Sequence, residues 1–197
     1  MARQTHINGS NLKPDADLTD AKLYFANLTG ARLTDAYLDG ANLTDGDLSG
    51  VDLSGVSSGG ITGTPSDLPT NWQLTGGYLI GPEANLAGAN LSGTNLAGAN
   101  LANADMAGAT LTGTNLHQAL LPPAMPSLPV TSGAVVTVSN ALSVSGLVQV
   151  DTGGKLAITS DSLTAGALNM QGGTIQAAIF SLDLDQIGDL SGHGPLF

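Results

Sequence analysis

The sequence predicts an all-β fold in which the chain winds as a solenoid, and three observations lead to this prediction. Leucine recurs at every fifth residue over two stretches, 16–55 and 84–121. A small residue, mostly alanine, stands two positions before each leucine, and glycine is common two positions after it. Repetition at a fixed period is the signature of a repeat architecture, in which stacked units share one continuous core.

A period of five residues fits neither regular element. On an α-helix, five residues turn a side chain through about 500°, so the leucines would form no face. On a straight strand, an odd step sends successive leucines to opposite faces. Every leucine is buried only if the chain turns a corner in each repeat, and glycine suits such corners. The predicted core is Leu18, Leu23, Leu28, Leu33, Leu38, Leu43, Leu48, Leu53, Leu86, Leu91, Leu96, Leu101, Met106, Leu111, Leu116 and Leu121.

The motifs Ala26–Gly30 (ANLTG), Ala41–Asp45 (ANLTD) and Ala89–Gly93 (ANLSG) resemble the pentapeptide-repeat family. The resemblance implies a right-handed, four-sided β-helix with four repeats per coil, and therefore two coils in each block. A few positions depart from the pattern without an expected effect on the core: Gly46, Val51, Thr94 and Thr114 replace the small alanine, and Met106 replaces a leucine.

The rest of the chain is expected to divide around these blocks. An N-terminal cap segment (1–15) precedes the first block, and a hairpin-like insertion (56–83), turning at Gly76-Gly77, separates it from the second. A Pro-rich linker (122–130) then leads to a Gly-rich β-repeat region (131–197). Thr131–Leu142 aligns with Thr152–Leu163 at an offset of 21, and the repeat continues at an offset of 19. This region resembles the passenger regions of bacterial surface and autotransported proteins, which implies an irregular β-solenoid.

Composition limits the function classes. The formal net charge of −11 argues against nucleic acid or an anionic membrane as a partner. The absence of cysteine excludes disulfides and thiol chemistry. No signal peptide is recognisable, so a cytoplasmic location is the default expectation, and an extracellular one follows if the chain is a fragment.

No catalytic, cofactor-binding or metal-binding constellation is expected. His6, His117 and His193 lie in three different segments, and His117 is predicted to be a solvated side chain at an outward position. Asp183, Asp185 and Asp189 could bind calcium, but a solvated turn is favoured because the Gly-Gly-x-Gly-x-Asp motif is absent. The sequence therefore predicts a protein that is not an enzyme.

The favoured function is a structural or protein-interaction module, with another protein as partner and possible end-to-end or side-by-side homo-oligomers. Its candidate partner surface consists of Asp17, Asp45, Asp47, Asp52, Trp72 and Tyr78. For Trp72 and Tyr78, a small apolar lid over the solenoid is favoured over a binding patch. A second possibility is a piece of a secreted surface or adhesion protein.

A third possibility is an acidic DNA mimic that binds a type II topoisomerase, as some members of the resembled family do. Residues 16–55 hold seven acids and two bases, a net charge of −5, whereas residues 84–121 hold only Asp105. Two coils rise about 10 Å, a length of duplex DNA that carries about six charges. The first block matches this density and the second does not, so the DNA-like stretch is short.

Overall fold

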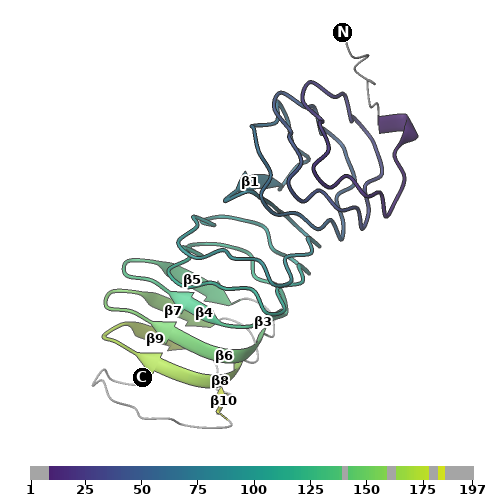
Figure 1. Ribbon diagram of the computed structural model, residues 1–197. Coiled ribbons are helices and arrows are strands. Elements are labelled where there is room, and N and C mark those ends of the chain that lie inside the picture. The colour runs from purple at the N-terminus through teal and green to yellow at the C-terminus, as the bar shows by residue number, and fades with distance from the viewer. Residues whose placement is uncertain (1–8, 139–141, 159–162, 178–181, 185–197) are drawn as a thin grey trace. The chain divides into compact units, whose positions relative to one another are not determined.

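The structure, a computed structural model, describes residues 9–138, 142–158, 163–177 and 182–184 (Figure 1). The chain divides into two compact units, residues 1–86 and residues 87–197. Apart from one 3-10 turn, η1 (Gly9–Asn11), the regular elements of the described residues are strands and bridges. The fold is all-β, as the repeat pattern predicts.

The first unit is a stack of coils built from five-residue repeats. Parallel bridges join residues 20 positions apart, as in Asp17 with Tyr37 and Asn42 with Thr62. Backbone hydrogen bonds tie each coil to the next: the Leu23 N–H donates to the Asn42 carbonyl at 2.9 Å. One coil therefore takes four repeats. That the coils are right-handed and four-sided stays a prediction.

The leucine ladder lies inside the coils. All sixteen predicted core side chains are buried, the most exposed being Leu18 and Leu121 at 8%. The residue two positions after the leucine repeatedly has a positive φ, as at Gly40 (69°) and Asp45 (53°). The left-handed conformation at this position produces the corner on which the five-residue period depends.

The segment 56–83 contains the expected hairpin, but its first part continues the solenoid. Strands β1 (Gln73–Thr75) and β2 (Tyr78–Ile80) pair antiparallel around Gly76-Gly77. Before them, Ser57, Thr62 and Asp67 bridge to the previous coil. The five-residue leucine period is broken here because Ser58 stands where the next leucine after Leu53 would be. Its buried hydroxyl accepts a hydrogen bond from the Leu79 N–H at 2.9 Å.

The second unit begins with five-residue repeats and continues as a stack of parallel strands. Bridges again join residues 20 apart, as in Asn90 with Thr110 and Asn95 with Asn115. The strands that follow are β3 (Ala124–Met125), β4 (Leu128–Val130), β5 (Val135–Val138), β6 (Leu142–Val150), β7 (Lys155–Ile158), β8 (Leu163–Met170), β9 (Thr174–Ala177) and β10 (Leu182–Leu184). They form two parallel sheets, β10-β8-β6-β3 with β4 beside β6, and β5-β7-β9 (Figure 1).

The prediction of a Pro-rich linker at 122–130 is wrong. Strands β3 and β4 lie within this segment and pair in parallel with β6. Leu128 and Val130 are fully buried. Proline does not prevent this pairing, because Pro129 still offers its carbonyl group and its neighbours fill the core.

The predicted register of the C-terminal repeat is wrong by one residue in β5. The offset of 21 would place Val135 beside Leu156, but the structure pairs Val136 with Leu156, an offset of 20. Both of these side chains are fully buried, and a slip of one residue would turn them outward. The offset of 21 holds for Leu142 with Leu163, and the offset of 19 holds between β7 and β9.

Candidate functional site

The asparagine or aspartate that precedes many of the core leucines has a structural task. Its side-chain oxygen accepts a hydrogen bond from the backbone N–H two residues later, closing an Asx turn at the corner. At Asn42 this bond to the Thr44 N–H is 3.0 Å long, and at Asp105 the bond to the Ala107 N–H is 2.9 Å. The same turn occurs at Asp17, Asn27, Asp47, Asp52, Asn90, Asn95, Asn100 and Asn115. The frequent Asn or Asp at this position is therefore explained by the fold alone.

The four aspartates of the predicted partner surface do not gather in one place. Asp17 bridges to Tyr37, Asp47 to Asn27 and Asp52 to Arg32, which are three different columns of the coil stack. Asp45 stands at a corner, two residues before Asp47, and is exposed. The carboxylates therefore surround the first unit rather than forming one acidic face.

Three of these carboxylates are held in their charged form. Hydrogen bonds from the Ser49 hydroxyl and N–H lower the pKa of Asp47, with a further bond from the Thr29 hydroxyl. Hydrogen bonds from Thr19 lower the pKa of Asp17. For Asp52, hydrogen bonds from Ser54 are the largest cause of a lowered pKa, and the charge of Arg32 adds least. The donors favour the ionised carboxylate because only that form accepts freely at both oxygens.

Trp72 and Tyr78 belong to the first unit and pack against its coils. Trp72 is half-buried beside the hydrophobic core, and its ring lies where a Cβ on Gly81 would stand. A Cβ on Gly59 would lie 3.3 Å from the Tyr78 ring. Both aromatic side chains thus cover glycine backbone, the arrangement expected of an apolar lid.

Other aromatic residues are more exposed, and the leucine pattern does not single them out. Phe25 is 67% exposed and Tyr37 is 51% exposed. The rings of Tyr24 and Phe25 meet edge to face, with their centroids 6.2 Å apart. Phe25 occupies a corner with a φ of 56°, a conformation that costs an L-residue about 1–2 kcal/mol. The signal in the sequence is a phenylalanine at a position that elsewhere is mostly glycine or aspartate.

His117 is not the solvated side chain that the repeat pattern predicts. It is half-buried, and its Nδ1 accepts a hydrogen bond from the Val135 N–H at 3.0 Å. The neighbouring Gln118 N–H donates to the Val135 carbonyl at 3.1 Å. The imidazole therefore joins the last five-residue coil to β5. His6 and His193 lie outside the described residues.

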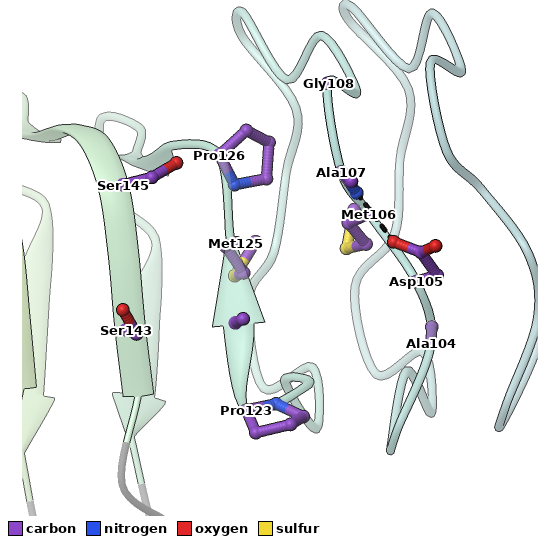
Figure 2. A pocket seen from close by; sticks show the side chains of 11 residues that line it. Ala104, Asp105, Met106, Ala107, Gly108, Pro123, Met125, Pro126, Ser143 and Ser145 are labelled. Atoms are coloured by element: carbon purple, nitrogen blue, oxygen red, sulfur yellow. Dashed lines mark hydrogen bonds between the residues drawn. The ribbon is translucent and has the colours of Figure 1, made fainter.

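A shallow cavity of about 310 Å³ opens in the second unit between residues 104–108 and β3 (Figure 2). Met106 and Met125 lie at its centre, with Pro123 and Pro126 on either side. The two prolines have no N–H with which to bond the preceding coil. Asp105 is the one titratable side chain in its lining, and its carboxylate is engaged by the Ala107 N–H. The cavity thus offers no acid–base pair.

The described residues hold neither a candidate metal cluster nor a membrane-spanning helix. No group of three or more histidine or acidic side chains within them could hold a metal ion. None of their helices has the length and apolar character of a membrane span. The calcium hypothesis involves Asp185 and Asp189, which lie outside the described residues.

Comparison with known proteins agrees with the repeat geometry. The model of the pentapeptide repeats matches residues 16–55 and 83–121 in eight copies. Searches of curated proteins and of solved structures found no match to the chain. The five-residue leucine period, the 20-residue coil and the family match lead to one conclusion: residues 16–55 and 83–121 are pentapeptide repeats.

Proposed function

We propose that this protein is a non-enzymatic interaction module that presents a fixed pattern of carboxylates to another protein. Family membership supports a structural or interaction role at the general level. The observation that carries the proposal is the state of Asp17, Asp47 and Asp52. Each is ionised and oriented by its own turn, as the lowered pKa values and the hydrogen bonds indicate. Charges fixed in this way favour a cationic partner at little further entropic cost.

The test exploits the Asx turn. Asparagine keeps the turn oxygen but removes the charge, so D17N/D47N/D52N retains the turns that other repeats make with asparagine. The full chain and this variant would be immobilised and exposed to extract from the native cells at low and high salt. We expect specific proteins to bind the wild type at low salt and to be lost with the variant. An identical bound set, or turnover of polysaccharides or phosphodiesters by the purified protein, would contradict the proposal.

DNA mimicry remains the alternative for the first unit, because residues 16–55 carry a net charge of −5. The distribution of the carboxylates over three columns and a corner speaks against it, since a duplex presents its phosphates in continuous rows. A gyrase supercoiling assay decides between the two. Inhibition by micromolar protein, lost in D17N/D47N/D52N, would favour mimicry, and an unchanged supercoiling rate would eliminate it.

The location of the protein and its self-association belong to the same proposal. The default is a cytoplasmic protein, and a surface protein is the alternative suggested by the β-repeats after residue 130. Fractionation of the native cells with an antibody separates these locations. Sedimentation of the full chain shows whether copies associate.

A further inference from the structure

We propose that the corner formed by Tyr24, Phe25 and Asp45, here called the Phe25 corner, binds an arginine side chain of the protein partner. This inference rests on the proposed interaction function and names the chemistry of one contact. Phe25 is the corner residue that the fold explains least. Phe25 is 67% exposed and has a positive φ of 56°.

Neither packing nor turn formation accounts for a phenylalanine at this corner. Every other non-glycine residue with a positive φ in the described part of the chain is Asp, Asn, Glu or Gln. Asp and Asn tolerate the left-handed conformation better than Phe, and all four side-chain types are well hydrated when exposed. Phe25 instead meets the ring of Tyr24 edge to face, so the two rings present one aromatic surface to solvent.

A carboxylate stands beside this surface. The Phe25 N–H donates to the Thr44 carbonyl at 2.8 Å, which places Asp45 at the same corner one coil later. Adjacent coils lie about 4.8 Å apart, so one arginine side chain can contact the Phe25 ring on one coil and the Asp45 carboxylate on the next. Asp45 is exposed, and no hydrogen bond within the described residues engages its carboxylate. In this it differs from Asp47, whose oxygens are engaged by Thr29 and Ser49.

The combination of ring and carboxylate indicates arginine. A guanidinium group stacks on an aromatic face and forms a bidentate pair with a carboxylate, whereas an ammonium group is a compact, strongly hydrated charge. Residues 16–55, which surround the corner in sequence, hold seven acids against two bases, Lys22 and Arg32. The corner therefore keeps a negative balance and complements a cation.

The experiment uses the full isotopically labelled chain and a synthetic peptide of alternating arginine and glycine. Matched peptides carry lysine or the neutral isostere citrulline in place of arginine. We expect the arginine peptide to shift the NMR signals of the Phe25 ring and the Asp45 amide. Citrulline should weaken binding by about tenfold, and lysine by less.

Three variants test the assignment. Phe25→Gly inserts the residue that most corners carry, so it should fold normally and lose about tenfold in affinity. Asp45→Asn should lose severalfold. Tyr37→Ala removes an exposed aromatic ring from another column and should bind the peptide as the wild type does.

Equal affinity for the arginine and citrulline peptides, or unchanged binding by Phe25→Gly, would overturn the proposal. The broader function fails in a different way. If D17N/D47N/D52N loses the cellular partner while Phe25→Gly keeps it, the interaction module stands and the Phe25 corner is wrong. If Phe25→Gly alone loses the partner, the corner is the binding site and the fixed carboxylates are not.

Discussion

At the level of single residues, the asparagine or aspartate before many of the leucines determines how the corner is made. Its side-chain oxygen closes an Asx turn, and the third residue after it takes the left-handed conformation. The sequence shows this residue preference, but its cause is visible only in the hydrogen bonds. The side-chain oxygen of these residues is therefore used by the fold, and only the charge of the aspartates is available for function.

Two substitutions of Asp47 separate the role of the turn oxygen from that of the charge. Asp47→Ala removes the acceptor of bonds from Ser49 and Thr29, so we expect the melting temperature to fall by a few degrees. Asp47→Asn keeps the turn oxygen and loses only the contribution of the charge, so its melting temperature should fall less than that of Asp47→Ala. Thermal unfolding followed by circular dichroism measures both. Equal losses in the two variants would show that charge, not the turn, matters for stability.

The lowered pKa values of Asp17, Asp47 and Asp52 predict sensitivity to acid. Their folded-state pKa lies below the ordinary value of 3.8, so they stabilise the fold above that pH. The stabilisation is lost as the pH falls below about 3.8 and through the folded pKa. Between pH 6 and pH 3, the free energy of unfolding measured with denaturant should fall less for D17N/D47N/D52N than for the wild type. Parallel pH curves for the two proteins would contradict the assignment.

At the level of elements, the hairpin β1–β2 and the prolines that flank β3 and lie in β4 interrupt the regular coil in different ways. The hairpin adds two short strands whose buried Leu79 and Ile80 complete the core where Ser58 is too short. The prolines remove N–H donors but leave the segment paired with β6. Glycine and proline at these places therefore indicate that the regular repeat is interrupted. They do not distinguish an insertion from a solenoid that continues with another repeat.

The hairpin gives a fluorescent test of its packing. A Cβ on Gly81 would overlap the Trp72 ring, so Gly81→Ala should displace the ring and cost about 1–3 kcal/mol. Because Trp72 is the only tryptophan, its emission should shift to longer wavelength. Gly30→Ala is the control, since a Cβ there meets nothing within 4 Å and only the φ of 66° is strained. An unshifted emission in Gly81→Ala would rule out the lid.

The junction at His117 makes a second test at this level. His117→Phe removes the acceptor of the Val135 N–H, and an unpaired donor in a half-buried place costs about 1–3 kcal/mol. Hydrogen exchange at the Val135 amide should accelerate by at least about tenfold. His117→Asn retains an acceptor and should restore part of the protection. Exchange unchanged by His117→Phe would show that the bond contributes nothing to the junction.

At the level of the whole molecule, stability is expected to be local, because each coil contacts only its neighbours. Leu43 belongs to the unit 1–86 and Leu96 to the unit 87–197, and both are fully buried. Leu43→Ala should cost about 2–5 kcal/mol and raise hydrogen exchange within the first unit. Leu96→Ala should do the same in the second. Exchange raised equally in both units by either variant would indicate one cooperative whole.

The sequence by itself determined the all-β repeat fold and its buried ladder, because a five-residue period buries every leucine only in a coil with corners. It also indicated the hairpin at Gly76-Gly77. The tertiary structure decided the continuation through 122–130, the pairing of Val136 with Leu156, and the hydrogen bond between the Val135 N–H and the His117 imidazole. These depend on contacts between residues about 20 positions apart, which a local pattern does not record. The same kind of contact places Asp45 beside Phe25, and the unusual phenylalanine at this corner thereby becomes part of a candidate binding site.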